Sequence, residues 1–279
     1  MVNFSICFFG CLCAAWISSI TLVTAYYRES PDNIDWKWWL KYPELHEEVS
    51  RMRGHKYLKD APNYTTDDIV KTLISTNTHI YGIQGTGVTM KLRRENLRNF
   101  STRFGFTGRG HQYIDVISKT LKDLSNIRPK LNSDHRGRVT CAEGHLEVFR
   151  KFLASNYSSA LVFEDDVVEI DGFTAQEISK LLVHSLNMFQ KRKWDVLFLG
   201  YCFAANKTLD ENLKIISIPK DKLFVKSCAS HCTHAYMVNR LAAKIYESEI
   251  SNKFLEISAT GIDTMFGDLI NYFGKSCNH

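Results

Sequence analysis

The sequence lacks the features that mark nucleic-acid-binding proteins, repeat proteins and dinucleotide-binding enzymes. No run of Lys and Arg is longer than three residues and the net charge is only +5, so nucleic acid is not an expected partner. No internal repeat or low-complexity tract is present, which disfavours a repeat-built lectin. The glycine-rich segment 82–87 lacks the G-x-G-x-x-G spacing of a dinucleotide-binding turn. Partners therefore have to be inferred from other motifs.

Charged residues are also missing from the first 27 positions, and the first one is Arg28. A helix over residues 4–25 would be about 33 Å long, enough to cross a bilayer. The small residues at 23–25 suit signal-peptide cleavage equally well. Residues 1–27 are therefore expected to be a signal anchor, which would contact the membrane, or a cleaved signal peptide. Either outcome places the remainder in the lumen of the secretory pathway (endoplasmic reticulum or Golgi), as a single-pass type II membrane protein or as a secreted protein.

Sequons and cysteines agree with a lumenal environment. Four N-x-[ST] sequons follow the apolar segment, at Asn63, Asn99, Asn156 and Asn206. Five cysteines lie beyond that segment, and in an oxidising lumen such an odd number leaves at least one unpaired or intermolecular. Cys228 and Cys232, with the neighbouring His231 and His234, also offer zinc-type ligands. Their spacing does not match the common zinc-finger pattern, and lumenal cysteines favour disulfides.

The hydrophobic pattern predicts one α/β domain after a stem. Residues 28–75 are polar and aromatic, interrupted by prolines, and are interpreted as a stem that packs onto a catalytic domain at 76–279. Short apolar runs predict strands at 78–83, 160–163, 194–200 and 235–238, and helical spacing predicts helices at 90–104, 115–124, 144–155, 173–190 and 240–249. This alternation predicts a mostly parallel, mixed sheet flanked by helices.

Three acidic residues, Glu164, Asp165 and Asp166, stop the apolar run 160–163. A buried strand that ends in carboxylates places them at the carboxyl edge of the sheet, where α/β folds bind ligands. Carboxylates packed this closely repel one another and favour a compensating cation. Oxygen ligands favour Mn²⁺ or Mg²⁺, which also grips a diphosphate. The alternative is a solvated acidic turn or a helix N-cap.

Five blocks of sequence in a fixed order resemble a known family. They are C-x-x-x-H at 141–145, VFEDDV at 162–167, WDxLxLG at 194–200, TxAY at 233–236 and IDT at 262–264. Together they are similar to glycosyltransferase family twenty-five, which contains enzymes of lipooligosaccharide biosynthesis and the procollagen galactosyltransferases. The resemblance covers about residues 78–272. Two departures stand out: Ile83-Gln84 replaces the usual Asn-Leu pair before the arginines Arg93 and Arg94, and Gly144-His145 replaces a Ser-His pair.

The resemblance implies a single-domain, nucleotide-sugar-binding glycosyltransferase fold of the A type. It implies a metal-dependent, inverting transfer of a hexose, usually from UDP-galactose, to a glycan or glycoprotein acceptor. By the same carry-over, Asp166 ligates Mn²⁺ or Mg²⁺ and Glu164 faces the metal or the ribose of the UDP-sugar. Asp165 serves either site or the sheet edge, and Arg93 and Arg94 lie at the donor site.

An inverting transfer needs a base on the acceptor hydroxyl. Asp263 in the IDT block is the first candidate, and its alternative role is the N-cap of a following helix. His145 is the second candidate. The competing hypothesis of another class is a catalytically inactive relative that acts as a lumenal or cell-surface binding protein.

Overall fold

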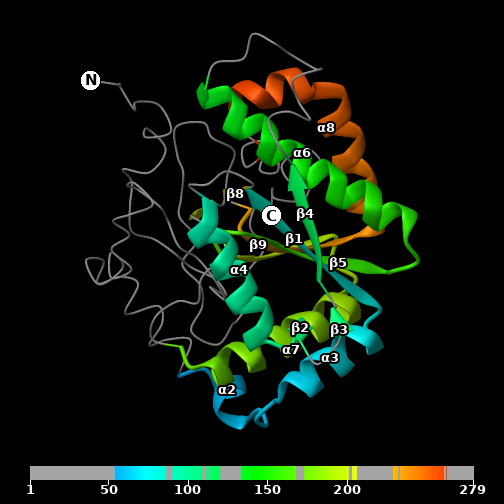
Figure 1. Cartoon of the computed structure of the whole chain (residues 1–279). Coiled ribbons are helices and arrows are strands. Elements are labelled where there is room, and N and C mark those ends of the chain that lie inside the picture. Colours follow the sequence, from blue (N-terminus) through cyan, green and yellow to red (C-terminus); the bar gives the residue numbers. More distant parts are fainter. Residues whose placement is uncertain are drawn as a thin grey trace.

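A five-stranded mixed sheet forms the centre of the protein (Figure 1). The computed structural model describes residues 54–85, 90–108, 111–112, 114–119, 133–167, 173–200, 203–205, 229–231, 233–260 and 262. The strand order is β4-β1-β5-β9-β6, with bounds β1 (Thr78–Gly85), β4 (Ile114–Lys119), β5 (Ser159–Glu164), β6 (Val196–Gly200) and β9 (Ala235–Asn239). β1 pairs in parallel with β4 and β5, whereas β9 pairs antiparallel with both β5 and β6. Four strands therefore point one way, and β9 lies reversed among them.

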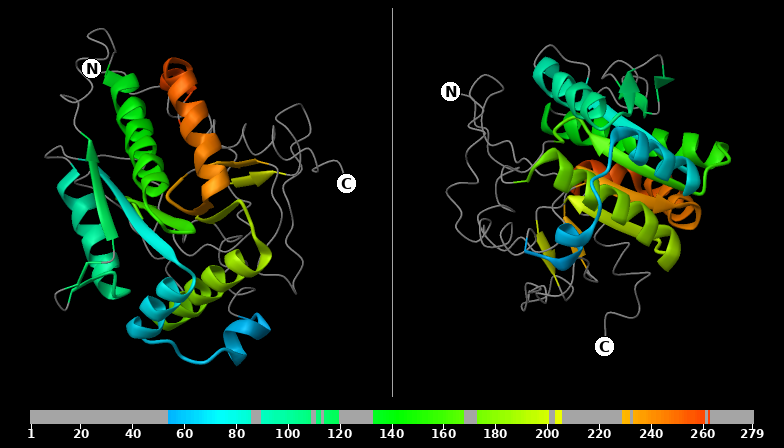
Figure 2. Two further views of the ribbon diagram at one scale, coloured as in Figure 1. Left: turned by 90° about the vertical axis from the view of Figure 1, so that its right-hand side faces the viewer. Right: turned by 90° about the horizontal axis from the view of Figure 1, so that it is seen from below.

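Helices cover both faces of this sheet, as two views show (Figures 1 and 2). Two long helices, α6 (Ser133–Ala154) and α8 (Arg240–Thr260), pack together on one face. The opposite face carries α3 (Thr66–Ser75), α4 (Lys91–Arg103) and α7 (Ala175–Arg192), with the short α2 (Lys56–Asp60) against α7. Two small ribbons complete the described elements: β2 (Thr107–Gly108) with β3 (His111–Gln112), and β7 (Phe203–Ala205) with β8 (Ala229–His231).

Each face of the sheet has its own hydrophobic core, because neighbouring residues of a strand point to opposite faces. In β5, Leu161 and Phe163 belong to the core beneath α3, α4 and α7. Ala160 and Val162 belong to the core beneath α6 and α8. All four side chains are almost fully buried. A strand buried on both faces reads as one continuous apolar run, which explains why the sequence predicts β5 so well.

Polar side chains fix the ends of several helices. Thr65 and Asp68 form a reciprocal capping box at the start of α3, and Thr174 and Glu177 form another at the start of α7. At the C-terminal end of α6, the Arg240 guanidinium donates to the carbonyl oxygens of residues 152, 153, 155 and 157 at 2.7–3.2 Å. Residues 152 and 153 belong to the last turn of α6, whose carbonyls lack intrahelical partners, and residues 155 and 157 follow the helix.

The predicted α/β architecture is confirmed, and one predicted element is wrong. The strands predicted at 78–83, 160–163, 194–200 and 235–238 are present. Residues 115–124 were predicted as a helix, but 114–119 form the edge strand β4. Ile114 and Ile117 are three residues apart, a spacing that suggests one helical face. They instead lie in the cores on opposite faces of the sheet. The helices predicted at 144–155 and 240–249 are the C-terminal half of α6 and the N-terminal half of α8.

The segment interpreted as a stem contributes to the domain core. Leu58 of α2, and Ile69 and Leu73 of α3, are buried in the same core as Leu161. Within the described residues, no helix is long and apolar enough to span a membrane. The uncharged segment at residues 4–25 lies outside that range.

Candidate functional site

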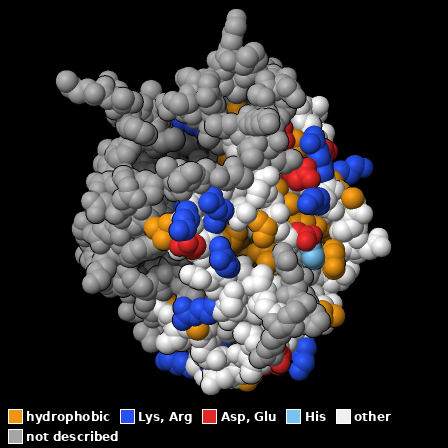
Figure 3. Space-filling view, viewed as in Figure 1, with side chains coloured by type: hydrophobic (Ala, Val, Ile, Leu, Met, Phe, Trp, Pro, Cys, Tyr) orange, Lys and Arg blue, Asp and Glu red, His pale blue; other side chains and the backbone are white. Residues whose placement is uncertain are grey.

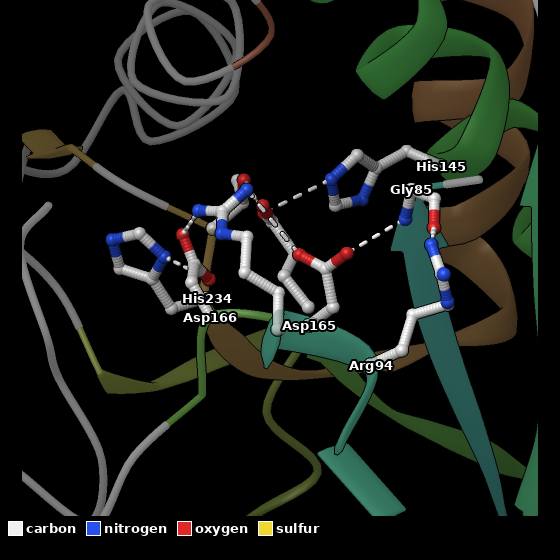
Figure 4. Close-up of polar contacts among 9 residues, drawn as sticks. Gly85, Arg94, His145, Asp165, Asp166 and His234 are labelled. Atoms are coloured by element: carbon white, nitrogen blue, oxygen red, sulfur yellow. Dashed lines mark hydrogen bonds and ion pairs between the residues drawn. The ribbon is translucent and has the colours of Figure 1, made fainter. Parts of the chain in front are cut away.

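The three carboxylates lie together at the carboxyl edge of the sheet, where Figure 4 shows Asp165 and Asp166. Glu164 is the last residue of β5, and Asp165 and Asp166 form the turn that follows. The end of β1 at Gly85 lies on one side. On the other side lie Thr233 and His234, because β9 runs antiparallel and therefore begins where β5 ends. The side chains of Asp165 and Asp166 are only 8% exposed.

Asp165 is held by the backbone of β1 and by α4. Its Oδ2 accepts a hydrogen bond from the Gly85 backbone N–H at 2.6 Å, and its Oδ1 lies 3.3 Å from Nη1 of Arg93. Burial raises the pKa of Asp165 to about 6, although Arg93 and the Gly85 hydrogen bond oppose that rise. A Cβ at Gly85 would lie 2.8 Å from Cγ of Met90, so glycine permits the close approach of the residue preceding α4.

Both oxygens of Asp166 face nitrogen atoms. Oδ2 accepts from Nη2 of Arg93 at 2.5 Å, and Oδ1 lies 2.8 Å from Nδ1 of His234. Burial on its own would raise the pKa of Asp166. The positive charges of His234 and Arg93 outweigh that effect and lower the pKa well below its usual range. Asp166 is therefore an ionised carboxylate at neutral pH.

Glu164 is held from the opposite side. Its Oε1 accepts from the Thr233 hydroxyl and lies 3.2 Å from Nε2 of His145. Nδ1 of His145 lies 2.8 Å from the Tyr236 hydroxyl, and both of those side chains are fully buried. Burial alone would raise the pKa of Glu164, but the hydrogen bond from His145 and nearby positive charge give a net lowering. This carboxylate is also ionised at neutral pH.

The arrangement brings together donor atoms that suit a divalent cation. One carboxylate oxygen each of Glu164 and Asp166 and one nitrogen of His234 all lie within 4.8 Å of one another. Cys141, His145 and Glu164 form a second such group. Two carboxylates and an imidazole match the preferences of Mn²⁺ among other first-row metals. The residues present therefore fit the metal that the sequence predicts.

The structure brings most of the predicted site residues together. Glu164, Asp165, Asp166 and Arg93 contact one another or a shared neighbour. Arg94 donates from Nη1 to the Gly85 carbonyl oxygen at 2.9 Å. Its position at the end of β1 supports the strand terminus beside the site. Asp263, Cys228 and Cys232 lie outside the described residues.

Sequence reasoning missed three contributors and the identity of one counter-ion. His234, Thr233 and Tyr236 reach the site because β9 is antiparallel to β5, a direction that an apolar run of four residues does not reveal. The compensating cation expected beside the acidic triplet is supplied in part by Arg93 itself. A signal was present: Thr233 and His234 are polar residues placed directly before a buried strand.

No protein-family model and no curated protein match this chain.

Basic side chains border the site on one helix. α4 carries Lys91, Arg93, Arg94, Arg98 and Arg103. Figure 3 shows Lys and Arg side chains gathered over this part of the surface. A cationic surface beside ionised carboxylates offers two kinds of contact to a phosphate-bearing ligand: direct pairing with guanidinium groups, and bridging through a divalent cation.

Proposed function

We propose that this protein is a metal-dependent glycosyltransferase that transfers a hexose to a glycan or glycoprotein acceptor with inversion of configuration. The first candidate for the donor is UDP-galactose. The observation that carries this proposal is the convergence of Glu164, Asp166 and His234 at the carboxyl edge of an open α/β sheet. That edge is where such sheets bind nucleotide ligands. The observed mixed sheet flanked by helices is compatible with the A-type glycosyltransferase fold, and that fold is part of the proposal.

In this proposal Glu164, Asp166 and His234 hold Mn²⁺ or Mg²⁺. When bound, the metal supplies positive charge to the diphosphate of the donor and to the charge that develops as the sugar departs. Arg93 already lies on Asp165 and Asp166. With a divalent cation held there, the Arg93 guanidinium would be free to pair with a phosphate oxygen of the donor instead. Such an exchange would couple donor binding to metal binding.

The proposed acceptor base is Asp263, as the sequence blocks imply. The side chain of His145 is fully buried, with its two nitrogens facing Tyr236 and Glu164. That placement suits a role within the site rather than contact with an acceptor.

The proposed location is the lumen of the endoplasmic reticulum or Golgi, reached through the uncharged N-terminal segment.

A second candidate function is a binding protein without transferase activity. The observation that favours it is the salt bridge of Arg93 with both Asp165 and Asp166. An internal cation that already neutralises these carboxylates would make a metal unnecessary for the fold. In that case the site would bind a sugar nucleotide or a glycan weakly and turn nothing over.

The substitution Asp166→Asn separates these functions, because it removes charge with little change in shape. We expect purified Asp166→Asn to lose at least about 100-fold of Mn²⁺-dependent UDP-hexose turnover, since the charge stabilising the leaving diphosphate would be lost. Asp60→Asn, at the exposed end of α2, is the matched control and should keep the full rate. Equal turnover and equal Mn²⁺ dependence in Asp166→Asn and wild type would rule out the metal assignment. Donor binding without any turnover in wild type would favour the binding protein.

A further inference from the structure

A buried chain of hydrogen bonds ends on one oxygen of Glu164. It runs from the Tyr236 hydroxyl to Nδ1 of His145 at 2.8 Å, and from Nε2 of His145 to Oε1 of Glu164 at 3.2 Å. The Thr233 hydroxyl donates to the same Oε1. Within the part of the chain that the structure describes, no hydrogen bond reaches the other oxygen, Oε2. One half of the carboxylate is thus held while the other half stays available.

The direction of each proton follows from the acceptor at the end. Ionised Glu164 can only accept, so Nε2 of His145 carries the proton that faces it. In the neutral imidazole, Nδ1 must then accept, and the Tyr236 hydroxyl donates to it. A phenol, with an ordinary pKa of about 10, keeps its proton throughout the neutral range. For a neutral His145, this chain of hydrogen bonds therefore specifies one tautomer, with the proton on Nε2.

The surrounding packing leaves His145 little freedom to move. It follows Gly144 on α6, where an added Cβ would lie 2.7 Å from Cγ2 of Ile83 in β1. That close approach presses this turn of the helix against the sheet. The imidazole also stacks on the Tyr236 ring, with centroids 5.7 Å apart and an angle of 28° between the planes. The Phe149 ring lies behind Tyr236, at 6.5 Å.

We propose that Tyr236, His145 and Thr233 are positioning residues that fix Glu164 so that Oε2 is presented to the divalent cation. The inference rests on the proposed metal site and assigns a role to residues that would not themselves touch the metal. Outer hydrogen-bond partners of this kind orient ligand atoms, and their loss commonly weakens metal binding by about 10- to 100-fold. His145 thereby acts through Glu164 and is not the acceptor base.

Mn²⁺ affinity measured by calorimetry on the purified full chain, without donor or acceptor, tests this role directly. Tyr236→Phe removes only the hydroxyl and should raise the Kd for Mn²⁺ about tenfold. His145→Gln should raise it by about 10- to 100-fold. Tyr246→Phe is the matched control: it deletes the hydroxyl of another buried tyrosine in the same core, and the Kd should stay at the wild-type value. Thr233→Val should raise the Kd for Mn²⁺, whereas Thr233→Ser, which keeps the hydroxyl, should leave the Kd near the wild-type value.

The double variant distinguishes positioning from general loss of structure. If Tyr236 acts through His145, Tyr236→Phe should have no further effect on the Kd once His145→Gln is present. Fully additive effects, or a wild-type Kd in both single variants, would overturn the positioning role while leaving the metal site intact. If wild type itself binds no Mn²⁺, the proposed function and this inference are both wrong. Thermal melts of each variant separate unfolding from lost affinity, and Tyr236→Phe provides the test should His145→Gln fail to fold.

Discussion

Removing the guanidinium of Arg93 should make metal binding tighter and the metal-free protein less stable. Arg93 lies 3.3 Å from one oxygen of Asp165 and 2.5 Å from one oxygen of Asp166. Arg93→Gln leaves both buried carboxylates without this partner. Breaking a largely buried ion pair from one side costs about 3–5 kcal/mol. Because the Arg93 side chain is 28% exposed, we expect the lower end, a loss of about 3 kcal/mol in the free energy of unfolding.

The same substitution removes a competitor for the metal. A divalent cation at Asp166 has to displace or repel the guanidinium, and without that repulsion we expect the Kd for Mn²⁺ to fall at least tenfold. A tenfold change corresponds to about 1.4 kcal/mol of additional stabilisation at saturating metal. Urea unfolding with and without Mn²⁺ therefore has a distinct signature. Arg93→Gln should begin less stable than wild type and gain more from the metal.

Arg98→Gln, on an exposed position of the same helix, is the matched control. It should change neither the metal-free stability nor the response to Mn²⁺ by more than about 0.5 kcal/mol, as expected for surface substitutions. The reasoning is refuted if Arg93→Gln and wild type gain the same free energy from Mn²⁺. Equal metal-free stability of the two proteins would also show that the ion pairs contribute nothing net.

Three further predictions concern stability and modification. Arg240→Gln should lower the free energy of unfolding by about 2 kcal/mol, because the Arg240 guanidinium donates to four carbonyl oxygens. As a control in the same urea titration, Arg150→Gln should cost less than about 1 kcal/mol, because Arg150 has a 3.4 Å contact with Glu247. Burial lowers the pKa of His184 to about 4 from 6.5, so stability is fully present above pH 6.5 and should fall by up to about 3 kcal/mol between pH 6.5 and 4; a pH series on which His184→Phe has the same slope as wild type would contradict this. Expressed in a eukaryotic cell, the chain should carry N-glycans on one or more of its exposed sequon asparagines, and an unchanged gel mobility after enzymatic deglycosylation would count against a lumenal domain. Among the described residues, the exposed sequon asparagines are Asn63, Asn99 and Asn156.

The sequence predicted the elements whose signal is local. β5 is buried on both faces, so its apolar run and the acids that end it identify both the strand and the sheet edge. β4 was missed because Ile117, Leu121 and Leu124 follow a helical spacing, although Ile114 and Ile117 lie in different cores. Sequence periodicity alone cannot tell one helical face from two faces of a sheet, and only pairing with β1 decides it.

The candidate site was predictable only in part, for a related reason. Its carboxylates are consecutive in the chain and visible as a motif. Most of their partners are 68–80 residues away in the chain, as in the Gly85–Asp165, Arg93–Asp166, Thr233–Glu164 and His234–Asp166 contacts. His145, 19 residues before Glu164, is the nearer exception. Placing His234 beside Asp166 requires the direction of β9, which a short apolar run does not encode. The resemblance named the block containing Thr233 and Tyr236 without revealing that both residues support Glu164.

The reversed strand β9 also sets an order of assembly during synthesis. β6 joins the sheet only by pairing with β9. During synthesis β9 emerges about 35 residues after β6, because the chain is made from its N-terminus. Until β9 arrives, β5 has one unpaired edge, and unpaired edges of this kind are where other chains can add. Thr233 and His234 enter together with that strand. A chain released before this point would hold Asp166 without its imidazole partner His234, so the proposed capacity to bind metal would report completion of the sheet.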